Sequence, residues 1–227
     1  MATSDVAICN MALSNIGQVA NVVSIDPAEP SVEAEYCRVF YYTCRDAVLE
    51  AHLWSFTVRT DTAPAQVTPP TPNWEYAYAF PAGAQDIIAV LPPEAANPYA
   101  QGIVPDPIAA AYGAPTPIGG GFVPQPYELL TLSTGQTVIC TNQEQAEIRY
   151  RFNNTDVSKY PATVIMAISH LLGSKLAGPV IQGKEGRAEA LNQLQLYKTH
   201  LDIAKADDAN QRKINPIHVP TAIAARQ

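Results

Sequence analysis

Prolines are concentrated in the middle of the chain, and this distribution most constrains the fold. Of the 20 prolines in 227 residues, fourteen lie between Pro64 and Pro126. Proline lacks a backbone N–H and blocks the interiors of helices and central strands, so this region must consist of loops, turns and short or edge strands. The flanking regions carry helical periodicity instead. The sequence therefore predicts an α+β protein with helical ends and a β-rich middle.

The longest helical pattern runs from Ser31 to Phe56. Apolar and aromatic side chains recur there at spacings of three and four, and Ser31 is placed to cap the N-terminus. The pattern predicts one long helix that continues into a strand beginning at Trp54. Because few of its positions are polar, we expect this helix to be covered on several sides, as the central element of a helical core.

Three further helices are predicted. The first spans Ser4–Ile16, with Ser4 placed to cap it and Gly17 placed to end it, and has Leu13 and Ile16 on its apolar face. The third begins at Pro161 and is expected to end at Gly178-Pro179. The last, from about Lys184 to Asp208, has a heptad-like seam suited to packing on another helix, formed by Ala190, Leu194, Tyr197, Leu201 and Ala204.

Alternating patterns predict strands in the middle of the chain. The expected strands are Trp54–Thr60, Trp74–Phe80, Ile87–Leu91, Tyr127–Leu132, Thr137–Cys140 and Ala146–Phe152, the last three in one small antiparallel sheet. Residues 92–126 show no periodicity and form a long Pro/Gly loop. The expected organisation is a four-helix core from residues 1–58 and 158–209, a β-rich insertion at 59–157 and an extended C-terminal arm at 210–227.

Charge and composition argue against several functions. The net charge of -7 disfavours a protein that wraps nucleic acid, because such binding depends on neutralising phosphates. No apolar run approaches the roughly 20 residues of a membrane span, so no membrane association is expected. Cys37 and Cys44 are seven residues apart on a helix, about 10.5 Å along its axis, which is too far for a disulfide. We expect buried, reduced thiols.

No catalytic, metal-binding or cofactor-binding pattern emerges. The four histidines, His52, His170, His200 and His218, are widely separated in sequence, and the Gly119–Gly121 run lacks the Lys-Ser/Thr of a phosphate loop. The sequence therefore predicts no enzyme and no cofactor. The aromatic residues Trp54, Trp74, Tyr76 and Tyr78 could form a platform for sugars or bases, but their alternation favours one buried face of a sheet.

Packing residues recur along the chain in a characteristic order and spacing. They include an RDxxLxxxxWxF run, which is a packing pattern without chemistry of its own. The core residues of the series are Leu13, Ile16, Tyr41, Arg45, Asp46, Trp54, Trp74, Tyr76 and Tyr78. Over most of residues 4–209 this series resembles the tail tubular protein A family of tailed bacteriophages. These proteins are head-to-tail adaptors, or connectors, that lie beneath the portal.

The resemblance implies a structural virion protein assembled in the host cytoplasm. It implies a ring, generally of twelve subunits, with the helical part towards the portal and the β insertion towards the tail. DNA would pass through the centre without sequence-specific binding. About twelve copies of this acidic chain would carry roughly -84 charges, and such a conduit would repel phosphate.

Two contact regions are predicted from the sequence. The arm is basic and carries apolar residues, so we expect it to bind the portal protein through Arg212, Lys213, Ile214, Ile217, His218 and Arg226. The long loop is expected to contact a neighbouring subunit or the tail nozzle or tube protein through Tyr99, Ile103, Tyr112, Ile118 and Phe122.

Alternative functions remain open at this point. A head-completion protein of a long-tailed phage shares the expected helical core. A glycan-binding module would use the aromatic β insertion, and a tail-associated hydrolase would require a catalytic constellation.

Overall fold

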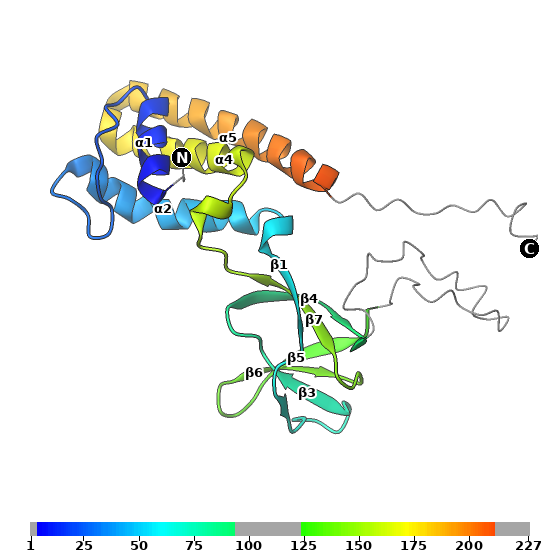
Figure 1. Ribbon diagram of the computed structural model, residues 1–227. Helices are drawn as coiled ribbons and strands as arrows, with labels where there is room; N and C mark the ends of the chain where they lie inside the picture. The colour runs from blue at the N-terminus through cyan, green and yellow to red at the C-terminus, as the bar shows by residue number, and fades with distance from the viewer. Residues whose placement is uncertain (1–3, 94–123, 212–227) are drawn as a thin grey trace, which may run out of the picture. The chain divides into compact units, whose positions relative to one another are not determined.

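The structure is a computed structural model that describes residues 4–93 and 124–211 (Figure 1). The chain divides into two compact units. Among the described residues, the helical unit comprises 4–56 and 154–211, and the β unit comprises 57–93 and 124–153. The described residues contain four α-helices and two antiparallel sheets, which confirms the predicted α+β class.

The first helix, α1 (Asp5–Asn15), begins and ends with the caps that its sequence predicts. The Ser4 hydroxyl accepts a hydrogen bond from the Ala7 amide at 3.1 Å, satisfying one of the free donors of the first turn. At the other end Gly17 has a φ of +72°, and the Gln18 amide donates to the Leu13 carbonyl at 2.9 Å. Glycine adopts this left-handed conformation without the steric cost that a Cβ would bring.

The second helix, α2 (Val32–Glu50), is shorter than predicted. A 3-10 turn, η1 (Ser55–Thr57), separates it from strand β1 (Val58–Thr62), so the predicted strand start at Trp54 is wrong. The Trp54 side chain is fully buried, and its indole N–H donates to the Val48 carbonyl at 3.0 Å. This bond satisfies a carbonyl in the last turn of α2, where the helix itself offers no donor.

The expectation that α2 is covered on several sides is also wrong. Its buried residues lie on one side, while Val32 and Val39 are 63% and 52% exposed. The helix packs mainly on α4 (Ala162–Ile181), which also packs against α1 and α5 (Gly183–Gln211). The central element of this unit is therefore α4.

The buried side of α4 is the one that its periodicity predicts. Val164, Ile165, Ile168, Leu171, Leu172 and Leu176 are all buried. The predicted stop at Gly178-Pro179 is wrong, because the helix continues to Ile181. A proline in the last turn removes a single backbone hydrogen bond, and the chain leaves the helix only where Gln182 and Gly183 adopt φ values of +61° and +64°.

By length and composition, α4 could cross a membrane, so the prediction that no apolar run is long enough is wrong. In this fold, 61% of the apolar window is buried inside the protein. The hydrophobicity of α4 is that of a core helix enclosed by its neighbours.

The last helix, α5, packs on α4 along the predicted seam. Leu201 and Ala204 are buried, and Ala190, Leu194 and Tyr197 are partly buried against the same core. Gly186 is also buried, and a Cβ at this position would lie 2.7 Å from the Ala177 carbonyl oxygen. Only glycine allows α5 to approach the α4 backbone this closely.

The β unit contains two antiparallel sheets rather than the single small sheet predicted for its last three strands. One sheet has the order β1–β7–β4, with β4 at Ala84–Leu91 and β7 at Glu147–Phe152. The other has the order β2–β3–β6–β5, comprising Gln66–Val67, Tyr76–Ala79, Thr137–Thr141 and Tyr127–Thr131. Consecutive strands β6 and β7 thus belong to different sheets, a separation that local alternation does not reveal.

Alternating residues of β3 and β6 face two different clusters. Tyr78 and Ile139 belong to a cluster with Ile148 and Tyr150 of β7, while Ala77, Val138 and Cys140 form a second, smaller cluster. Both faces of the four-stranded sheet are therefore covered in part by apolar side chains.

Candidate functional site

The described residues contain no group of three His, Cys, Asp or Glu side chains placed to hold a metal ion. The four cysteines are buried and unbridged, which confirms the prediction of buried thiols. Burial raises the pKa of Cys44 to about 11, so this thiol is protonated and unreactive at neutral pH.

Two histidines that are distant in sequence meet in the helical unit. The rings of His170 on α4 and His200 on α5 stack with centroids 4.8 Å apart. His170 Nδ1 lies 2.7 Å from Gln193 Oε1, and the Gln193 amide donates to the Asn15 carbonyl at 2.9 Å. Burial, with His170 nearby, lowers the pKa of His200. This network ties α5 to α1 and α4.

The fold also brings together a serine, a histidine and an aspartate, but without the connectivity of a catalytic triad. Ser55 donates to Asp208 Oδ1 through its hydroxyl at 2.6 Å and its amide at 2.9 Å. His52 Nε2 lies 3.4 Å from Asp208 Oδ2. In a triad the histidine bridges the other two residues and takes the serine proton. Here the carboxylate is the bridge, so the set anchors the end of α5 to the segment after α2.

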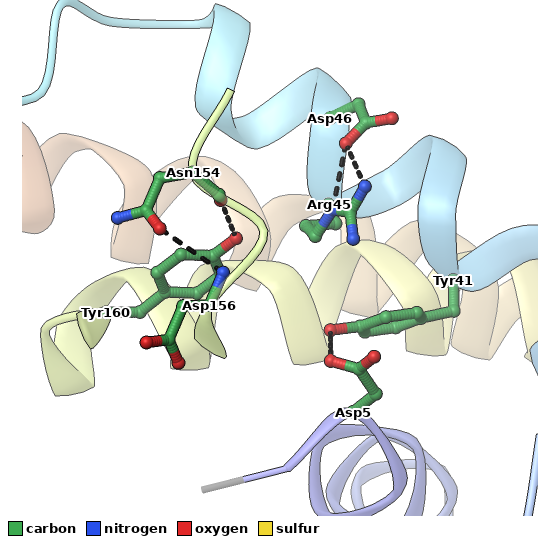
Figure 2. Close-up of polar contacts among 7 residues, drawn as sticks. All are labelled: Asp5, Tyr41, Arg45, Asp46, Asn154, Asp156 and Tyr160. Carbon is green, nitrogen blue, oxygen red and sulfur yellow. Dashed lines mark hydrogen bonds and ion pairs between the residues drawn. The ribbon is translucent and has the colours of Figure 1, made fainter. Parts of the chain in front are cut away.

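The residues that carry the family resemblance lie mainly inside the helical unit. Leu13, Ile16, Tyr41 and Trp54 are buried. Figure 2 shows the Tyr41 hydroxyl donating to Asp5 at 2.7 Å. Burial and this bond both raise the pKa of Tyr41, so the phenol stays neutral and links α2 to α1.

The Arg45-Asp46 pair is part of the same interior. The Arg45 side chain is only 9% exposed and donates to its neighbour Asp46 at 2.9 Å (Figure 2). Its guanidinium also lies 5.3 Å from the centre of the Tyr42 ring. A buried cation needs such compensation, so the pair acts in packing and not in chemistry.

The segment that leads into α4 has its own polar contacts. Tyr160 donates to the Asn154 carbonyl at 2.5 Å, and Asn154 Oδ1 accepts from the Asp156 amide at 3.2 Å (Figure 2). Burial raises the pKa of Tyr160 to about 12. These bonds fix the turn before α4 and leave no group poised for reaction.

The four aromatic residues considered as a ligand platform do not share one surface, and the prediction of one buried sheet face is also wrong. Trp54 lies in the core of the helical unit. In the β unit, Tyr76 and Tyr78 pack with one apolar cluster and Trp74 with the other. The Trp74 indole donates to Glu128 at 2.8 Å. The alternating pattern placed Trp74 on the same strand face as Tyr76 and Tyr78. In the structure Trp74 precedes strand β3 and does not share that face.

One shallow pocket of about 370 Å³ occurs beside the end of α1. It is lined by Asn15, Ile16, Gly17, Ile181, Glu185 and Glu189. The two glutamates are too few ligands for a metal site.

The outer side of α2 carries exposed apolar residues. Val32 and Val39 are exposed there, and the half-buried rings of Tyr36 and Phe40 stack beside them with centroids 6.5 Å apart. We call these four residues the α2 stripe. Their spacings of four, three and one place them on one side of the helix. The sequence pattern revealed these apolar positions but not that they are left uncovered.

The contact residues predicted from the sequence lie outside the described residues. This applies to the portal-binding set of the arm and to the five apolar and aromatic residues of the long loop, all within 94–123 and 212–227. The ends of the loop do lie close together, because the Gln125 amide donates to the Val90 carbonyl at 2.7 Å.

Comparison with known proteins adds no assignment. No protein-family model matches the chain, and no curated protein shows significant similarity to it.

Proposed function

We propose that the chain is a structural virion protein, a head-to-tail adaptor that forms a ring between portal and tail and encloses a conduit for DNA. The observation that carries the proposal is the division of α2 into two sides. One side holds the buried resemblance residues Tyr41 and Arg45. On the other side Val32 and Val39 of the α2 stripe are exposed, while Tyr36 and Phe40 pack in part on the helical core. An uncovered apolar helix face on a folded unit is typical of a protein–protein contact.

In this proposal the four helices form the ring-building core, and the proline-rich insertion with its long loop provides contacts to the tail. The polar clusters described above support a non-enzymatic role, since each of them joins structural elements. The net charge of -7 per chain suits a conduit to which DNA does not adhere.

The test is association with the portal protein of the virus that encodes the chain. The purified proteins are mixed, and their complex is sized by light scattering during gel filtration. The proposal predicts a complex with a mass of many adaptor chains per portal ring. Separate elution of the two proteins at all mixing ratios would contradict it.

The glycan-binding and hydrolase alternatives predict a different result. Either would give binding or turnover of a bacterial surface polysaccharide by the isolated chain. Trp54 is fully buried in the core of the helical unit, which argues against its use in an aromatic platform.

A further inference from the structure

The helical unit has a second exposed surface, on α5. One edge of the exposed side of α5 carries Lys184, Arg187, Leu191 and Lys198, all exposed. Their spacings of three, four and seven keep them on one line along the helix. We call them the α5 line. None of its three bases forms an ion pair with another described residue.

The acids of the same half of α5 lie elsewhere. Glu185 and Glu189 line the pocket beside Asn15 and Ile181. Glu189 also accepts a hydrogen bond from Gln193 at 2.7 Å. Between Lys184 and Lys198, therefore, the bases lie along the line and the acids towards α1. Asp202, which is exposed and five turns from Lys184, places one acid at the C-terminal end of the line.

The surroundings of the α2 stripe have the opposite charge. Over Val32–Glu50 the helix carries four acids and two bases. One base, Arg45, is buried, and the other, Arg38, is paired with Glu35 at 2.6 Å. Glu50 is exposed and lies eighteen residues, or five turns, from Val32, so it extends the stripe in a straight line.

We propose that the α2 stripe of one copy docks on the α5 line of a second copy of this chain. Leu191, which is 69% exposed, would contact Val39 and its neighbours. The aliphatic stems of Lys and Arg side chains can cover aromatic rings such as Tyr36 and Phe40 while a charged end reaches Glu50. Apolar contact and charge complementarity then act on the same pair of surfaces.

The placement of α2 and α5 makes the proposed contact head-to-tail rather than twofold. α2 and α5 each pack on α4 and have little direct contact with each other (Figure 1). The two surfaces are therefore distinct, so each copy uses one surface towards one neighbour and the other surface towards the next. Such a head-to-tail contact repeats and closes into a ring when its rotation permits. The inference rests on the proposed function for its biological meaning, but the contact itself can be tested without it.

Engineered cysteines provide the test, because the four native thiols are buried. Two full-length variants, Val39→Cys and Leu191→Cys, are treated with a short bismaleimide cross-linker, separately and as a mixture at high protein concentration. Both changes are at exposed positions. The matched control is Leu129→Cys, an exposed leucine of the β unit, mixed with Val39→Cys.

The proposal predicts that the Val39→Cys and Leu191→Cys mixture gives covalent dimers at several times the yield of either variant alone or of the control mixture. Reversing a charge on the line with Lys198→Glu should reduce that yield at least severalfold, while Lys159→Glu, at an exposed position that belongs to neither surface, should leave it unchanged. Cross-linking of Val39→Cys to itself would show a twofold contact and overturn the proposal. Equal yields in all mixtures would also overturn it.

The same readout separates this inference from the proposed function. Specific cross-links in a chain that does not associate with the portal would support the contact and refute the adaptor role. Portal-bound chains that give no cross-link between these two positions would support the adaptor role and refute the contact.

Discussion

At the scale of single residues, the described polar groups of the helical unit act as connectors. Asp208 is the clearest case. It is 4% exposed and accepts two hydrogen bonds from Ser55, which is 153 residues away in sequence. The bonds hold the last turn of α5 against the segment that follows α2. A carboxylate buried in this way is stabilising only while its partners are present.

Replacing Asp208 with alanine is expected to lower the free energy of unfolding by about 1–3 kcal/mol, because it leaves the Ser55 amide and hydroxyl without their acceptor. Urea unfolding followed by circular dichroism measures the loss. The neighbouring Asp207→Ala is the control, since Asp207 is exposed and its replacement should change stability by no more than about 0.5 kcal/mol. Equal effects of the two variants would show that the Ser55 contact contributes nothing.

The stacked histidines predict a pH dependence. Burial lowers the pKa of His200 below its ordinary value of 6.5, so the unfolded chain binds this proton more readily than the folded chain does. The contribution of neutral His200 is therefore complete above pH 6.5 and is lost as the pH falls from there towards the lower folded pKa. We expect the urea concentration at the unfolding midpoint of the wild type to decrease as the pH is lowered from 7.5 to 5.5.

The variant His200→Gln isolates this contribution because glutamine does not titrate. Its urea midpoint should fall less than that of the wild type over the same pH range. An identical pH dependence in the two proteins would assign the effect to other groups.

At the scale of elements, α4 is the helix on which α1, α2 and α5 all pack. It is the most apolar helix, and the approach of α5 to it depends on Gly186. A Cβ at this position would meet the backbone carbonyl of Ala177 at 2.7 Å, and a backbone group cannot rotate away as a side chain can. The two helices would have to separate, which loosens the packing along the whole seam.

Gly186→Ala is therefore expected to destabilise the protein by about 1–3 kcal/mol, although alanine favours the helix intrinsically by up to ~1 kcal/mol. Chemical denaturation measures the net effect. The control Thr199→Ala, at an exposed position of the same helix, should be neutral or slightly stabilising. A stabilising Gly186→Ala would show that the helices do not approach each other as described.

Elements defined by local signals could be predicted from the sequence. Ser4 and Ser31 cap their helices as expected, and the buried positions of α4 follow its periodicity. The predictions were wrong where the structure of a segment depends on its contacts with distant parts of the chain. Trp54 is held by the end of α2 rather than in a strand, and β6 and β7 lie in different sheets.

The candidate site shows the same limit. The helical period of α2 could not show that Val32 and Val39 stay uncovered by the rest of the described chain, because exposure depends on where α4 packs. The contacts Ser55–Asp208 and His170–His200 join residues far apart in sequence, and no local sequence pattern predicts such contacts.

At the scale of the whole molecule, the proposed role assigns the C-terminal arm to the portal. Residues 212–227 carry Arg212, Lys213 and Arg226 and no acid, in contrast to the acidic remainder of the chain. Truncation after Gln211 leaves α5 complete. We expect the truncated protein to keep its unfolding midpoint and to lose at least tenfold in affinity for the portal, as measured by surface plasmon resonance. Unchanged affinity would remove the arm from the portal contact.

The long loop can be tested in the same particle. Residues 94–123 can be replaced by a short Gly/Ser link, because the hydrogen bond between Gln125 and Val90 already brings the flanking chain together. The proposal predicts a folded chain that assembles poorly with the tail. Normal tail attachment with the shortened loop would exclude a contact role for it.

The central claim is that many copies of this chain form a ring around the path of the DNA between head and tail. Electron cryomicroscopy of the assembled virus particle tests it most directly. The account predicts a closed ring of this chain beneath the portal, with α2 of each copy against α5 of the next. A particle whose head-to-tail junction is fully built by other proteins, with this chain absent from it, would contradict the account.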